Sequence, residues 1–331
     1  MEKILKNKDR IEWIDIAKGF CIFLVVLGHT GIPKLLSAWI WSFHMPLFFF
    51  VSGILFNSSK YSTLKFFFNN RLKTLIRPYI IFSIVVFIWS KFLNYNLLSL
   101  KFYELYAGWQ GMALWFIPVL FSTEIFFYTI KKYFKHVPYI LLTLLILSII
   151  GYVCYLNSFH LPFKLEVVLT SVLFYGIGNL SGKYIIYFFE KTKLIILIFD
   201  LIILFILSLW ISVINKPVLD MAFNIIGHYF TTYFGAFLGI SFMFVISVLL
   251  SRISTNFIDY FKKIISYLGR NTFVILAFHQ IVLMNLKMIF ERFSIPYYLN
   301  TGIRHLIMWS ILFLLSLSIN NYCPWVLGKK K

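Results

Sequence analysis

Two titratable side chains lie on one face of the first long apolar segment, residues 12–31. Lys18 and His29 are eleven residues apart, and an α-helix brings residues at that spacing to within about 20° of the same direction. The rise between them is about 16.5 Å, so this face carries a cation near one end and an imidazole near the other. Asp15 precedes Lys18 by three residues and can pair with it. A histidine near neutral pH can take or give a proton, as a general base must.

Two further histidines lie inside apolar segments at a comparable depth. His44 stands two residues before Pro46, which removes a backbone donor, and His279 lies about twelve residues into the segment 267–289. Three imidazoles at one depth on three helices could line one cavity. Each could instead only hydrogen-bond a neighbouring helix. This alternative weighs most for His279, less for His44 and least for His29, which shares its face with Lys18.

Two acids also lie deep in apolar segments, Glu124 and Asp200. A charged group at membrane depth costs roughly several kcal/mol, so each is a functional candidate. Either could be a proton or cation partner, and either could be a protonated carboxyl bonded to a neighbouring helix. The three cysteines are far apart with no C-x-x-C spacing, so neither a disulfide framework nor a zinc site is indicated, and we expect no metal.

The composition places these side chains in a membrane. Of 331 residues, 60% are apolar and 13% are charged, against roughly 45–50% and 25% in soluble domains. We predict an all-α integral membrane protein with about ten transmembrane helices, forming one polytopic domain over residues 1–331. The ten apolar runs are 12–31, 39–57, 78–98, 112–130, 138–156, 166–182, 194–214, 228–250, 267–289 and 303–322.

The basic residues predict the orientation of these helices. The formal net charge is +19, and 21 of the 31 Lys and Arg residues lie in alternate connecting segments, which predicts that both termini are cytosolic. Because the charge is spread over short segments, no basic domain is left for nucleic acid. The segment 58–77 has apolar residues among five basic ones and suits a helix in the cytosolic interface. A positive-inside loop touching anionic lipid is the alternative.

Five sequence blocks carry a resemblance to a known family. They are IEWIDIAKGFCIFLVVLGH at 11–29, SFHMPLFFFVSGILF at 42–56, NRLKTLIRPYIIFS at 70–83, LWFIPVLF at 114–121 and LGRNTFVILAFHQ at 268–280, about a quarter of the chain. In this order they resemble the membrane acyltransferase-3 family, the polytopic O-acyltransferases of cell-surface carbohydrates. The resemblance is strongest to the fucose-acetylase-like branch, which lacks an extracytoplasmic esterase-like domain.

The resemblance implies a reaction and a set of site residues. In that family an Arg precedes an essential His by ten intervening residues; Lys18 stands here at the Arg position and His29 at the His position. The implied donor is cytosolic acetyl-CoA, and the implied acceptor is a carbohydrate hydroxyl at a bacterial cytoplasmic membrane. His29 would be the general base or the acyl carrier, and His44 would orient it or donate to the oxyanion. The expected donor-binding residues are Lys18, Arg71, Lys73 and Arg77, with support from Asp15, Trp115, Asn271 and His279.

A transporter or flippase that uses intramembrane His, Asp and Glu as a proton relay is the competing class. Transporters often show paired Gly- or Pro-interrupted helices in two related halves. Pro46 and Pro118 interrupt two predicted helices, but the second half offers no counterpart pair. The sequence therefore favours the enzyme. It leaves a scaffold role, the identity of the acceptor and a homo-oligomeric state open.

Overall fold

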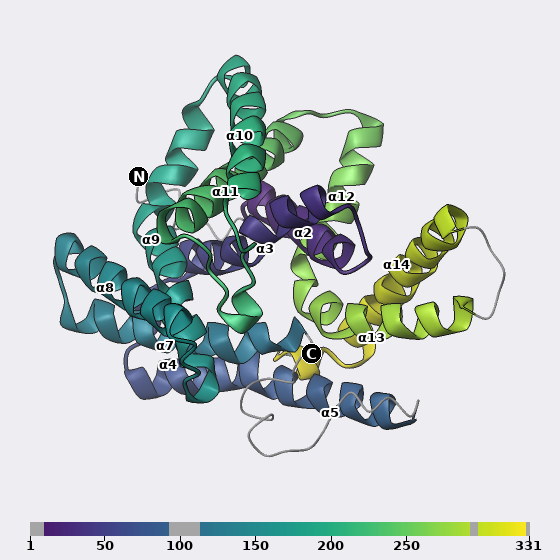
Figure 1. The fold of residues 1–331 in the computed structure, drawn as a ribbon, viewed down its shortest axis with the longest axis horizontal. Coiled ribbons are helices and arrows are strands. Elements are labelled where there is room, and N and C mark those ends of the chain that lie inside the picture. The colour runs from purple at the N-terminus through teal and green to yellow at the C-terminus, as the bar shows by residue number, and fades with distance from the viewer. Residues whose placement is uncertain (1–9, 93–112, 292–296, 329–331) are drawn as a thin grey trace.

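The structure is a bundle of helices whose order follows the apolar runs (Figure 1). The computed structural model describes residues 10–92, 113–291 and 297–328, and these residues contain no strand. The helices are α2 (Glu12–Gly28), α3 (Lys34–Leu55), α4 (Leu64–Arg71), α5 (Arg77–Phe92), α7 (Phe116–Tyr133), α8 (Val137–Leu156), α9 (Leu165–Lys191), α10 (Leu194–Ile214), α11 (Tyr229–Arg252), α12 (Asn256–Arg270), α13 (Thr272–Phe290) and α14 (Tyr297–Tyr322).

Each of the ten predicted runs overlaps one of these helices. Nine helical spans among the described residues are long and apolar enough to cross a membrane, with α4 and α5 together forming one of them. The first run is α2, which has 17 residues and is not among the nine. The third run, 78–98, continues past Phe92 into residues outside the described part of the chain. The predicted fold class, an all-α multi-pass membrane protein, is confirmed.

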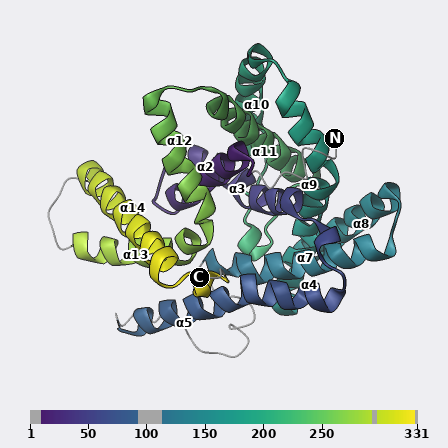
Figure 2. The ribbon, with the colours of Figure 1, turned by 180° about the vertical axis from the view of Figure 1, so that it is seen from behind.

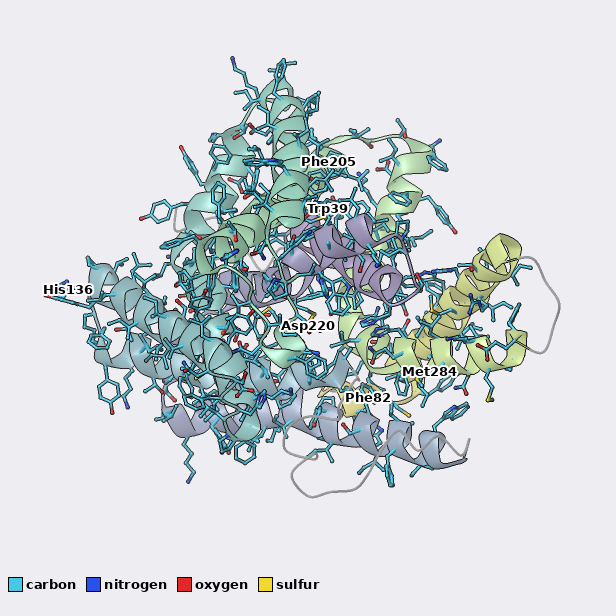
Figure 3. All side chains as sticks on the ribbon, viewed as in Figure 1. Trp39, Phe82, His136, Phe205, Asp220 and Met284 are labelled. Atoms are coloured by element: carbon cyan, nitrogen blue, oxygen red, sulfur yellow. The ribbon has the colours of Figure 1, made fainter. Side chains whose placement is uncertain are left out.

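The burial pattern of the helices is that of a protein surrounded by lipid. The central helix α3 is mostly buried and packs on α9, α11 and α2. The very apolar α10 leaves most of its apolar side chains exposed, and those of the last helix α14 are mostly partly or fully exposed. Trp39 of α3 holds α10 by donating from Nε1 to the Ser208 hydroxyl at 2.9 Å and by an edge contact with Phe205 (Figure 3). Exposed apolar side chains on outer helices are stable only against hydrocarbon, so these helices face the bilayer.

Glycines allow two helix pairs to approach backbone to backbone. Gly269 of α12 lies against the Asp15 carbonyl of α2, and Gly53 of α3 lies against the Tyr175 carbonyl of α9. A Cβ at either position would collide with that carbonyl oxygen. Small residues at helix contacts are the usual means of close packing within membranes. These two contacts fix α12 on α2, and α9 on α3.

The polar segment before the ninth run is itself helical. Residues 256–270 form α12, which begins where the Thr255 hydroxyl accepts from the Ile258 amide and ends at Arg270, with Asn271 as its C-cap. The helix buries one face on α2 and leaves Phe257 80% exposed on the other. Asn271 lies at the junction with α13, where its side-chain oxygen accepts from Asn320 of α14 at 2.6 Å. Asn271 thus joins three helices.

The basic segment 58–77 leads into a continuous helical run. Residues from Leu64 onward form α4, then a π-helical stretch at Leu72–Ile76, and then α5. Figure 2 shows α4 and α5 along one side of the molecule, with the C-terminal part of the chain against α5. A π-helical turn inside an α-helix often marks a functional site. The position of 58–77 in the cytosolic interface remains a prediction.

Candidate active site

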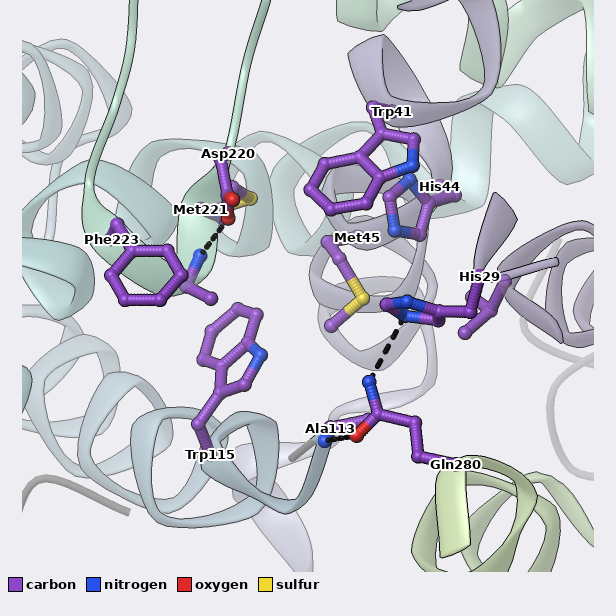
Figure 4. Close-up of a pocket in the computed structure, with 12 residues that line it drawn as sticks. His29, Trp41, His44, Met45, Ala113, Trp115, Asp220, Met221, Phe223 and Gln280 are labelled. Carbon is purple, nitrogen blue, oxygen red and sulfur yellow. Dashed lines mark hydrogen bonds between the residues drawn. The ribbon is translucent and has the colours of Figure 1, made fainter. Parts of the chain in front are cut away.

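One cavity of about 170 Å³ lies where the predicted histidine cluster was expected (Figure 4). It is formed by α2, α3, α13, the short turn before α7 and the segment between α10 and α11. Such a volume is below the roughly 300–1,000 Å³ of pockets that enclose a whole drug-sized ligand, so it suits the reacting ends of larger molecules. The lining residues are Val25, His29, Trp41, His44, Met45, Ala113, Trp115, Asp220, Met221, Ala222, Phe223 and Gln280.

His29 is held at the end of α2 by Gln280 of α13. The Ala113 backbone amide can only donate, so the Gln280 side-chain oxygen, 2.8 Å away, is the acceptor. This fixes the amide group, and its Nε2 then lies 3.3 Å from Nε2 of His29 (Figure 4). The Gln280 Nε2 group donates, so His29 Nε2 must accept, and the ring proton lies on Nδ1. His29 therefore has a basic lone pair on Nε2, which accepts from Gln280 at the cavity wall.

The other two predicted histidines converge on His29. The His279 ring centroid is 5.3 Å from that of His29, and the Trp41 ring centroid lies 5.8 Å from both His29 and His44. His44 Nδ1 donates to the Ile40 carbonyl at 2.9 Å, and His279 Nδ1 donates to the Ile275 carbonyl at 3.0 Å. In the neutral form of either ring, Nε2 is therefore the unprotonated nitrogen, and that of His279 is buried without a hydrogen-bond partner among the described residues.

A hairpin between α10 and α11, residues 215–228, closes the opposite side of the cavity. Its two arms pair through Asp220 and Ile225, and Asn224 turns the chain with φ of 53°. The Asn224 side chain donates to the Gly151 carbonyl at 3.0 Å and accepts from the Thr170 hydroxyl at 2.8 Å. These bonds clamp the hairpin to α8 and α9, although some of its residues, Phe223 among them, remain exposed.

The structure places the predicted Lys18 and Asp15 at the far end of α2. Lys18 Nζ lies 3.9 Å from the Asp15 carboxylate, which also pairs with Arg10 at 2.8 Å. The Lys18 side chain remains 21% exposed. It shares a helix face with His29 but does not line the cavity. The predicted cation and imidazole are therefore separated by about 16.5 Å along the helix axis.

The other three predicted basic residues lie apart from the cavity and have different surroundings. Arg71 Nε forms an ion pair with the buried Glu124 of α7 at 2.6 Å, and the guanidinium lies over the Phe67 ring at 5.7 Å. Arg77 lies over the ring of Trp325 at 5.2 Å. Lys73 is exposed. Glu124 thus has a structural partner, and the Arg71 charge is neutralised within the protein.

Of the supporting residues, Trp115 and His279 belong to this region, whereas Asn271 joins α12, α13 and α14 at a distance from the cavity lining. Sequence reasoning missed Gln280, Trp41, Met45 and the hairpin. Gln280 could have been noticed because it directly follows His279 in the block LAFHQ. Adjacent residues of an α-helix point only about 100° apart, so both side chains can reach the same region. Nothing in the sequence pattern of 215–228 distinguishes it from an ordinary connecting loop.

Comparison with known proteins identifies one family. A family model described as an acyltransferase domain matches residues 11–327, nearly the whole chain. The matched region contains His29, Gln280 and the hairpin alike. No curated protein and no solved structure matches the chain.

Proposed function

The chain belongs to this acyltransferase family, and on that premise we propose that it transfers an acetyl group from acetyl-CoA to a hydroxyl of a cell-surface or lipid-linked carbohydrate. It is a multi-pass membrane acyltransferase. The family match identifies an acyltransferase. We further propose acetyl-CoA as the donor, a carbohydrate hydroxyl as the acceptor and the bacterial cytoplasmic membrane as the location of the protein. The observation that carries it is the unprotonated Nε2 of His29, held by Gln280 in a cavity sized for reacting groups.

His29 is the proposed general base. Its Nε2 takes the proton from the acceptor hydroxyl while that oxygen attacks the thioester carbonyl, and the CoA thiolate leaves and receives the proton. The bond formed is the ester C–O and the bond broken is the thioester C–S. The alternative is attack by His29 itself on the thioester carbonyl, which releases the CoA thiolate and gives an acetyl-imidazole. The acceptor hydroxyl then attacks this acetyl group and displaces the imidazole. Both routes require the lone pair on Nε2.

Gln280 takes part of the role first expected of His44. The Nδ1–H of His44 is occupied by the Ile40 carbonyl, so its Nε2 can only accept. The Gln280 amide group is a donor whose direction is fixed by Ala113. When a hydroxyl occupies His29 Nε2, this amide is free to donate to the carbonyl oxygen on which negative charge develops. His44 then orients the ring of Trp41, which it contacts together with His29.

The donor head is proposed to bind at the other end of α2. Lys18, Lys73 and Arg77 are partly or fully exposed cations suited to the phosphates of CoA. Arg71 already has Glu124 as its partner, so its contribution to donor binding is the smallest of the four. The pantetheine arm would follow the Lys18 to His29 face over about 16.5 Å and bring the thioester into the cavity.

The test is turnover of acetyl-CoA by the purified protein. We expect CoA release that depends on His29, so His29→Ala abolishes it while the protein keeps its elution profile and melting temperature. His160→Ala is the matched control, because His160 is exposed outside the cavity. Full turnover in a folded His29→Ala variant would contradict the mechanism. Solute uptake into vesicles without CoA release would contradict the enzyme and favour a transporter.

A further inference from the structure

The hairpin 215–228 is more firmly held than an ordinary connecting loop. Asn215 at its start accepts from the His228 amide at 3.1 Å and donates to the Thr232 hydroxyl at 2.9 Å, which closes the base. Lys164 of the turn before α9 donates to the Ala222 carbonyl at 2.6 Å near the tip. With the Asn224 clamp, bonds from α8, α9 and α11 fix both its base and its tip. A wall fixed in this way can position a ligand.

Asp220 is the acidic side chain among the residues that line the cavity. One of its oxygens, Oδ1, accepts from the Ala222 amide at 3.0 Å, which sets the turn. A carboxylate has further acceptor capacity on its second oxygen. Burial raises the pKa of Asp220, against the Ala222 and Phe223 amides and the charge of Lys164, which lower it. Asp220 is thus a partly desolvated acceptor on the cavity wall.

The aromatic residues of the cavity complement this carboxylate. Trp115 and Phe223 lie near the hairpin, and Trp41 lies beside His44 on the opposite side of the cavity (Figure 4). Aromatic faces offer flat apolar surfaces with a negative centre, which suit the C–H face of a saturated ring. A carboxylate accepts charge-assisted hydrogen bonds from hydroxyls. Together these groups match a compact ring that is apolar on its faces and hydroxylated at its edge.

We propose that the hairpin 215–228 is the acceptor-binding wall of the cavity, where Asp220 accepts from the hydroxyls of one neutral sugar ring and Trp115 packs against its face. This rests on the proposed function and names the part of the site that selects the acceptor. The ring is held so that a different hydroxyl reaches Nε2 of His29. Because Asp220 is negative and partly desolvated, it disfavours rings that carry a carboxylate. The acceptor ring is therefore neutral.

The experiment compares two rates of CoA release from acetyl-CoA by the purified protein. The first rate is measured with water as the only acceptor, and the second is the increase on adding methyl glucoside, methyl galactoside, methyl mannoside or methyl glucuronide. We expect at least one neutral glycoside to raise the rate and the glucuronide to have no effect. His29→Ala should abolish both rates.

Asp220→Asn is the decisive variant, because an amide oxygen can still accept from Ala222 and keep the turn. We expect kcat/KM for the glycoside to fall by about 10- to 100-fold, the range for a hydrogen bond to a charged group, and by much more than the water rate falls. Asp259→Asn on α12, outside the cavity, should alter neither rate.

The outcomes separate the two proposals. Unchanged glycoside stimulation in Asp220→Asn, an equal fall of both rates, or stimulation by the glucuronide alone would overturn the assignment of the hairpin. So would a wild-type protein that none of the neutral glycosides stimulates. A water rate that persists in His29→Ala would instead overturn the proposed function.

Discussion

The two ends of α2 hold their polar side chains in opposite ways. At the cavity end, three imidazoles from α2, α3 and α13 meet, and their Nε2 atoms are left unprotonated. At the other end, Lys18 lies beside Asp15, and elsewhere in the bundle Arg71 of α4 forms an ion pair with Glu124 of α7. A buried charge that is paired with an opposite charge contributes to structure, whereas a neutral imidazole that lines a cavity is a candidate for chemistry. We therefore assign the proposed reaction to the cavity and the Arg71–Glu124 pair to the scaffold.

The largest effect expected at the paired end comes from separating Arg71 and Glu124. Arg71→Ala leaves the Glu124 carboxylate buried and alone, so we expect the free energy of unfolding in detergent to fall by about 3–5 kcal/mol. Replacing both partners, as Arg71→Met with Glu124→Leu, should restore most of this stability. A single variant as stable as the wild type would show that the pair is not structural. A raised KM for acetyl-CoA in the stable double variant would return Arg71 to the donor site.

At the cavity end, the next effect is expected from Gln280. Gln280→Leu removes the donor beside His29, and we expect kcat to fall by about 10²–10³ with little change in KM, as for loss of an oxyanion donor. Gln280→Glu keeps an acceptor for Ala113 but places a carboxylate beside His29. That charge favours the protonated imidazole, so the acid side of the pH–rate profile should move to higher pH. Unchanged kcat in Gln280→Leu would remove Gln280 from the reaction.

The smallest effect is expected from replacing Lys18, whose side chain is 21% exposed. Lys18→Ala should raise the KM for acetyl-CoA by roughly ten-fold, the loss of one charge-assisted contact, and leave the KM for the acceptor unchanged. Lys18→Arg keeps the cation and is the matched control. An unchanged donor KM in Lys18→Ala would remove Lys18 from the donor site and make its pairing with Asp15 purely structural.

The sequence predicted what depends on position along a helix. A fixed rise of 1.5 Å per residue places His29, His44 and His279 at one depth once the apolar runs are known, and their contacts agree with this. The same arithmetic separates Lys18 from His29 by about 16.5 Å, and Lys18 is not among the residues that line the cavity. The ten apolar runs each overlap a helix because hydrocarbon admits only backbone that is internally bonded.

Contacts that depend on which helices lie side by side could not be predicted from the sequence. The Arg71–Glu124 pair joins two helices that are distant in sequence, and no periodicity indicates which helices touch. The side-chain amide of Gln280 faces His29 because its oxygen is held by the backbone amide of Ala113, which precedes α7. The hairpin 215–228 is held by side chains of α8, α9 and α11, so its position follows from the assembled bundle. Neighbouring sequence alone could not place it.

The most direct test of the account is the turnover of a histidine series under one set of conditions. His29→Gln, His44→Gln and His279→Gln alter the cavity cluster, whereas His136→Gln and His160→Gln alter exposed histidines outside it. We predict that His29→Gln loses at least about a thousand-fold in the rate of CoA release, that the other two cluster variants lose less, and that the exposed pair match the wild type. Wild-type turnover in His29→Gln, or a loss confined to the exposed histidines, would contradict the assignment of the reaction to this cavity.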